Sequence, residues 1–158
     1  MSKQRRTSRR MSNKKILAII GFTLVSAAIG YAVFNSMIPT NRSFPVLGVP
    51  ENTYLVTKHD SQNGYVFASK GTTSGKKSMG SMHIMPEIHV TQDQLGSIHM
   101  INEDTDSKHN LNIDEFNVHT KDLNYFETQT VTFVADKEGS FRYYCTIHPE
   151  MNGRLIVQ

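Results

Sequence analysis

A charge-free apolar run near the N-terminus divides this chain into parts with different properties. Residues Ile16–Phe34 form a stretch of nineteen amino acids without one charge. At about 1.5 Å rise per residue, a helix of that length spans roughly 30 Å, which is close to the thickness of one hydrocarbon core. We therefore expect residues 16–38 to form a transmembrane anchor.

The basic residues before this run predict its orientation. Residues 1–40 contain seven Lys and Arg and no Asp or Glu. Positively charged flanks stay on the cytoplasmic side of a membrane. We expect residues 1–15 to be a basic cytoplasmic tail and the C-terminal part to lie outside the cytoplasm, at the cell membrane or in the periplasm. A cleaved signal peptide is the alternative, although its apolar region usually has only about 7–15 residues.

The remainder of the chain is acidic. Of the 17 Lys and Arg and 14 Asp and Glu, residues 41–158 keep ten bases and all fourteen acids, a net charge of −4. A nucleic-acid-binding domain needs its Lys and Arg on the folded face, so no nucleic acid partner is expected. The single cysteine excludes a disulfide framework and a four-cysteine metal site within one chain.

Beyond the apolar run, the pattern indicates a stalk and one all-β domain. Residues 39–52 contain three prolines and one glycine, which predicts a stalk. Residues 53–158 show no helical period, and turn residues such as Asn63-Gly64 separate short runs, as in an antiparallel sandwich. The predicted strands are Thr53–Lys58, Gly64–Ala68, Glu87–Thr91, Ser97–Asn102, His109–Ile113, Gln129–Val134, Gly139–Cys145 and Gly153–Val157.

Three potential metal donors follow one another at steps of three residues, namely Cys145, His148 and Met151. Cys145 ends one predicted strand and the next begins at Gly153, so a tight loop can bring thiolate, imidazole and thioether to one point. Alternation places Cys145 and His109 on core-facing stripes. Two imidazoles and one thiolate with a weak axial Met form a blue-copper electron-transfer centre. The alternative is a chance combination of core Cys, surface His and core Met.

The loop also resembles a known family. Residues 143–157, YYCTIHPEMNGRLIV, are similar to the copper loop of the cupredoxins, the blue type 1 copper proteins, and most similar to the amicyanin and plastocyanin type. His109-Asn110, preceded by Asn102-Glu103-Asp104, resembles their upstream ligand segment, and Met85–Val90 resembles an early strand; the likeness covers roughly residues 83–158. It implies a Greek-key β-sandwich of about eight strands and one copper ion, with the ligands His109, Cys145, His148 and Met151.

The resemblance also assigns roles next to the ligands. Asn110 and Thr146 are expected to tie the two ligand segments together, and the Asn110 N–H is expected to point at the Cys145 sulfur. Ile147 stands where amicyanin has proline, so its N–H is expected to give a second bond to that sulfur. His148 is expected to reach the surface within an apolar patch that also comprises Leu123, Ile147, Pro149 and Met151.

These features predict a membrane-anchored, extracytoplasmic carrier of single electrons between redox proteins, such as a membrane oxidase or reductase. No catalytic motif is present, so the protein is not expected to be an enzyme. One alternative is a copper storage or delivery module that uses Met79, Met82 and Met85. Another is a non-catalytic copper subunit of a membrane oxidase. The dinuclear centre of such subunits has two bridging cysteines and cannot form with one.

Overall fold

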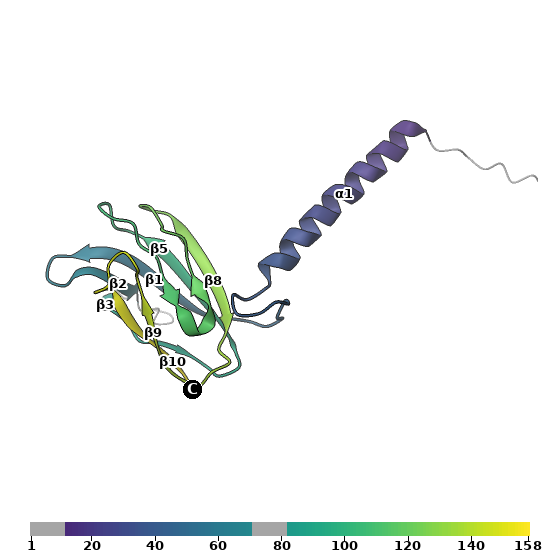
Figure 1. Ribbon diagram of the computed structural model, residues 1–158. Helices are drawn as coiled ribbons and strands as arrows, with labels where there is room; N and C mark the ends of the chain where they lie inside the picture. The colour runs from purple at the N-terminus through teal and green to yellow at the C-terminus, as the bar shows by residue number, and fades with distance from the viewer. Residues whose placement is uncertain (1–11, 71–81) are drawn as a thin grey trace, which may run out of the picture. The chain divides into compact units, whose positions relative to one another are not determined.

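The computed structural model describes residues 12–70 and 82–158. The chain divides into two compact units, and the boundary in the sequence lies between Met37 and Ile38. The first unit contains the helix α1, Asn13–Ser36 (Figure 1).

Helix α1 is long and apolar enough to cross a membrane. None of its residues is buried against protein. The hydroxyl groups of Thr23 and Ser26 donate hydrogen bonds to the carbonyls of Ile20 and Phe22, within the helix itself. Such bonds satisfy polar side chains where no water is available.

The second unit is a sandwich of two five-stranded sheets, which confirms the predicted all-β fold class. Its first sheet has the order β3-β2-β1-β5-β8 and its second sheet the order β4-β10-β9-β6-β7. The strands are β1 Glu51–Asp60, β2 Gly64–Lys70, β3 Met82–Ile84, β4 Ile88–Val90, β5 Leu95–Asn102, β6 Asn112–Ile113, β7 Val118–His119, β8 Thr128–Val134, β9 Gly139–Tyr144 and β10 Asn152–Val157, with a 3-10 turn η1 at Asp114–Phe116.

Alternate residues of both sheets meet in one buried core. Phe67 of β2 contacts Tyr143 of β9 edge to face, with ring centroids 5.3 Å apart. Both side chains are fully buried, as are Leu55 of β1 and Leu155 of β10. The inward stripe predicted for β9 therefore lies where the sequence pattern placed it, and it leads directly to Cys145.

The strand directions and the length of one strand differ from the sequence prediction. Each sheet contains one parallel pair, β1 with β5 and β4 with β10, whereas a purely antiparallel sandwich was expected. Hydrophobic alternation reports which face is buried and carries no information on the direction of the neighbouring strand. The strand predicted at His109–Ile113 is reduced to β6, because His109 forms an isolated bridge with Leu123 instead.

The beginning of the predicted stalk packs against the domain. The Asn41 side chain donates to the Val134 carbonyl at 2.8 Å and accepts the Val134 N–H at 2.9 Å, so it pairs with β8 as another strand would. The Thr40 N–H donates to Thr132, and Arg42 forms an ion pair with Asp136. This contact needs no regular secondary structure. A segment rich in proline and glycine can therefore pack against the domain although its composition predicts a stalk.

Candidate metal centre

Three of the predicted ligands come together at one end of the sandwich. One potential ligand atom from each of His109, Cys145 and His148 lies within 4.8 Å of the other two. His109 follows the loop after β5, Cys145 directly follows β9, and His148 lies in the loop between β9 and β10. His109 and Cys145 are fully buried, whereas His148 is half-buried.

The loop that carries Cys145 folds back on itself. The Cys145 N–H donates to the Met151 carbonyl at 3.0 Å, and the Met151 N–H donates to the His148 carbonyl at 2.9 Å. The Met151 side chain is fully buried in the same hydrophobic cluster as Cys145. The spacing of three residues is therefore the spacing of a closed turn that packs onto the core.

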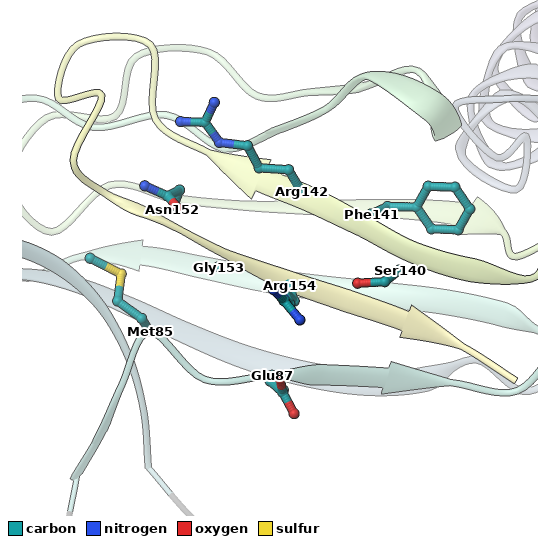
Figure 2. Close-up of a pocket in the computed structure, with 8 residues that line it drawn as sticks. All are labelled: Met85, Glu87, Ser140, Phe141, Arg142, Asn152, Gly153 and Arg154. Carbon is teal, nitrogen blue, oxygen red and sulfur yellow. The ribbon is translucent and has the colours of Figure 1, made fainter.

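Two exposed side chains of the second sheet donate hydrogen bonds to backbone carbonyls of this loop. Arg142 donates to the Pro149 carbonyl at 3.2 Å. Asn152 donates to the carbonyls of Pro149 and Glu150 at 3.3 and 3.0 Å. Figure 2 shows both side chains on adjacent strands, at the edge of a surface groove of about 690 Å³ next to the loop. The groove lies beside the donor cluster and does not include its residues.

Asp104 fixes the orientation of His109. Its Oδ2 lies 2.8 Å from His109 Nε2, and both side chains are buried. Nε2 then carries the proton and donates to the carboxylate, which leaves the Nδ1 lone pair for a metal. This Nδ1 lies 3.2 Å from Nδ1 of His148. The second nitrogen of His148, Nε2, lies 3.3 Å from the Ser107 hydroxyl. The two rings thus converge through the same atom type.

The electrostatics favour the neutral, metal-binding form of His109. Burial lowers the pKa of His109; the Asp104 hydrogen bond opposes this shift, and the proximity of His148 reinforces it. Burial by itself would raise the pKa of Asp104, but hydrogen bonds from the Asp106 N–H and from His109 outweigh it, so this pKa is lowered. A charged carboxylate therefore faces an uncharged imidazole.

Asn110 and Thr146 connect the two ligand segments. The Asn110 side-chain amide donates to the Thr146 hydroxyl at 2.6 Å, and the Thr146 N–H donates to the side-chain oxygen Oδ1 of Asn110 at 2.8 Å. The same Asn110 oxygen accepts from Asn112, and its amide also donates to Asp122. The residue after His109 is thus joined directly to the residue after Cys145.

Two expectations around the ligands differ from the geometry. Among the described residues, neither Asn110 nor Ile147 donates an N–H to the Cys145 sulfur. The apolar patch around His148 is also smaller than predicted, because Leu123 and Met151 are fully buried and only Ile147, 40 % exposed, and Pro149 remain at the surface. Leu123 is buried because its backbone pairs with that of His109.

Only part of the methionine group proposed for copper delivery lies within the described residues. Met79 and the side chain of Met82 lie outside the described residues. Met85 packs against the hydrophobic core. Its position favours a packing role for that residue.

Sequence reasoning gave no role to three residues at this site, namely Tyr65, Asp104 and Ser107, although it included Asp104 in the segment that resembles the upstream ligand segment of the cupredoxins. Asp104 and Ser107 lie in the loop that leads to His109, so the short distance along the chain was an available signal. Tyr65 lies on β2, and its ring contacts the rings of both His109 and His148. No local pattern predicts that contact, because it depends on how the two sheets pack.

The donor set fits copper. One thiolate, two imidazoles whose Nδ1 atoms converge and a nearby buried thioether residue are the soft and borderline donors that copper prefers. Every one of the three converging donors has a neighbour that restrains it: Asp104 for His109, the loop hydrogen bonds for Cys145, and Ser107 for His148.

A search of curated protein sequences finds no match. Solved structures with a similar fold include a copper nitrite reductase from Nitrosomonas europaea, at 19% identity over 70% of this chain with a TM-score of 0.49. The chain spans only 42% of that enzyme. A reduced auracyanin from Roseiflexus castenholzii matches at 17% identity over 70% of this chain and 99% of its own, with a TM-score of 0.47.

An oxidized amicyanin mutant matches at 23% identity over 47% of this chain and 70% of its own, with a TM-score of 0.38. The family comparison is more specific. Residues 77–157, half of the chain, match the family model of the cupredoxin-like domain, and the protein belongs to this family.

Proposed function

We propose that this protein is a membrane-anchored, extracytoplasmic copper protein that carries single electrons between redox proteins. The observation that supports the proposal is the convergence of His109, Cys145 and His148 within 4.8 Å. With Met151 as the fourth donor, these residues would hold one type 1 copper ion. Copper in such a site alternates between Cu(II) and Cu(I), because thiolate and thioether stabilise the reduced ion and imidazole suits both.

The restraints on the donors favour electron transfer. Donors that are already fixed move little when the charge of a bound ion changes, so little reorganisation opposes the transfer. Asp104 holds His109, and the pair Asn110 and Thr146 holds the two ligand segments in register. Of the three converging donors, only His148 is partly exposed, so its ring offers the shortest route to a docked partner.

The membrane location rests on α1 and the charges around it. The helix is apolar enough to span a bilayer, and the bases precede it or, as Lys14 and Lys15 do, lie in its first turn. We propose that residues 1–15 stay in the cytoplasm and that residues 53–158 form the extracytoplasmic copper domain. Protease added to intact cells should degrade this domain, and salt washes should leave the chain in the membrane fraction. A soluble mature form that lacks the helix would instead indicate a cleaved signal peptide.

An absorption spectrum of the full chain in detergent tests the copper function. After Cu(II) is added, we expect an intense visible band from thiolate-to-copper charge transfer. The band should disappear on reduction and return on reoxidation, with copper retained throughout. A chain that binds copper without the band, or that releases Cu(I) on reduction, would refute the carrier function and support storage or delivery.

A further inference from the structure

We propose that Tyr65 is a positioning residue of the metal centre, whose ring holds the His148 imidazole so that Nδ1 faces the other donors. The inference builds on the copper function proposed above. The ring centroids of Tyr65 and His148 are 4.0 Å apart and the ring planes are inclined by 39°. The same Tyr65 ring lies 5.5 Å from the ring of His109. One aromatic side chain therefore contacts both imidazole rings.

His148 is the donor that most needs such a contact. His109 is fully buried, its Nε2 is held by Asp104 at 2.8 Å, and its backbone pairs with Leu123 in both directions. His148 is half-buried on a loop without regular secondary structure, and its ring has two long polar contacts, from Nε2 to the Ser107 hydroxyl at 3.3 Å and from Nδ1 to His109 Nδ1 at 3.2 Å. Such long contacts at the ring edge still leave an imidazole some freedom to tilt. A ring against its face removes this freedom.

The position of Tyr65 is itself well defined. It follows the turn between β1 and β2 and is paired with His59 on β1. The Asp60 carboxylate accepts hydrogen bonds from the N–H groups of Gln62 and Asn63 and so closes that turn. Tyr65 and the core residue Phe67 share one face of β2, because side chains two residues apart point the same way. The ring is thus presented by a strand, which is a more rigid support than a loop.

The contact with His148 is made by the ring of Tyr65. Within the described part of the chain, the Tyr65 hydroxyl forms no hydrogen bond. The exposed His59 contacts the same ring edge to face, with centroids 4.9 Å apart. A contact between aromatic rings depends on the ring and is retained by phenylalanine. The substitution Tyr65→Phe should therefore preserve the function of this residue, and Tyr65→Leu should remove it while an apolar side chain remains.

The first test uses metal-free full-length protein in detergent with isotope-labelled histidine. In NMR spectra of the parent chain and of Tyr65→Phe, the ring protons of His148 should show the chemical-shift displacement that a neighbouring aromatic ring produces. In Tyr65→Leu this displacement should be lost. Tyr54→Leu is a matched control, because Tyr54 also stacks on a histidine, His99, at 4.7 Å but away from the donors. It should leave the His148 signals unchanged.

The second test measures Cu(I) affinity by competition with a coloured chelator. Loss of the ring contact should weaken Cu(I) binding by about three- to tenfold in Tyr65→Leu, whereas Tyr65→Phe and Tyr54→Leu should stay within about twofold of the parent. Unchanged His148 shifts in Tyr65→Leu, or a defect of equal size in Tyr65→Phe, would overturn the proposal. If the parent chain binds no copper, the copper function fails, and the metal-free NMR test still decides the contact.

Discussion

Asp104 and His109 form one buried hydrogen bond, 2.8 Å from Oδ2 to Nε2, at the end of a loop that is itself held in place. The Asp104 N–H donates to the side-chain oxygen of Asn102. The Asn102 amide in turn donates to the carbonyls of Ser107 and Leu123. The residue before the loop therefore fixes the carboxylate, and the carboxylate fixes the imidazole. The short segment before His109 orients this ligand.

The substitution Asp104→Asn should weaken copper binding. Asparagine keeps a side-chain oxygen that can accept the hydrogen bond from the His109 N–H. It removes the negative charge that makes the imidazole a stronger metal ligand. We expect copper affinity to fall by about 10- to 100-fold, measured by competition with a chelator. Asp106→Asn, at an exposed position of the same loop, is the control and should keep the parent affinity. Equal affinities for both variants would show that Asp104 has no influence on the ligand.

The cysteine and the methionine should differ in their effects. Cys145→Ala removes the only thiolate, so we expect it to abolish the visible band and most tight Cu(II) binding. Met151→Leu should keep the colour and shift the reduction potential, because the axial bond is weak. Absorption spectra and redox titration of the two variants measure this contrast. A Cys145→Ala protein that remained blue would rule out the proposed ligand set.

Asn110→Ala should affect both stability and the metal centre. The substitution removes four hydrogen bonds from a partly buried network, among them both bonds to Thr146. The Thr146 N–H would lose its partner, and the Asn112 amide would keep only its 3.5 Å bond to the Tyr144 carbonyl. This loss should lower the free energy of unfolding by about 1–3 kcal/mol. Urea unfolding of the metal-free chain measures this cost, and redox titration measures the accompanying shift in potential. Unchanged values in both experiments would mean that solvent replaces the network without loss.

Sequence reasoning located the features that depend on neighbouring residues. Period-two alternation placed Tyr143 and Cys145 on the buried face of a strand, and both are fully buried. The step of three residues from Cys145 to His148 to Met151 predicted a closed loop, which two backbone hydrogen bonds form. These predictions succeed because the local backbone geometry determines them.

Features that depend on distant pairing were not predictable. The parallel pairing of β1 with β5 joins residues 45 positions apart, such as Glu51 and Gly96. The contact of Tyr65 with His148 joins β2 to the last loop. Leu123 was expected at the surface, but its backbone pairing with His109 draws it into the core. Alternation identifies a buried face without identifying what covers it.

The β1–β2 turn should respond to acid in a defined direction. Hydrogen bonds from the Asn63 side chain and from the N–H groups of Gln62 and Asn63 lower the pKa of Asp60 below its ordinary value of 3.8. The unfolded chain therefore takes up this proton first, so the stabilisation is present above about pH 3.8 and is lost as the pH falls through the folded pKa. Asp60→Asn should be less stable than the parent at pH 7, and the difference should shrink near pH 3.

Urea unfolding of the metal-free chain at the two pH values measures this effect. Asp93→Asn, a substitution at another exposed turn, controls for the general loss of negative charge. A stability difference for Asp60→Asn that stays constant from pH 7 to pH 3 would contradict a role for the carboxylate charge at the turn.

The substitution Gly153→Ala should be strongly disruptive, although Gly153 needs no unusual backbone conformation. A Cβ atom at this position would lie 2.3 Å from both Cζ and the hydroxyl oxygen of Tyr143. The Tyr143 ring cannot move away, because it is fully buried and its hydroxyl donates to the Pro86 carbonyl at 2.6 Å. Such overpacking typically costs about 1–3 kcal/mol of stability.

Gly153 lies in β10, two residues after Met151. A shift of β10 would therefore also move the ligand loop. We expect Gly153→Ala to lower the urea midpoint of the metal-free chain and to alter the electron paramagnetic resonance spectrum of the Cu(II) form. Gly48→Ala is the control, since its Cβ would meet only the end of the flexible Leu95 side chain, at 3.1 Å. A Gly153→Ala protein with the parent's midpoint and spectrum would show that Tyr143 and β10 adjust independently of the donors.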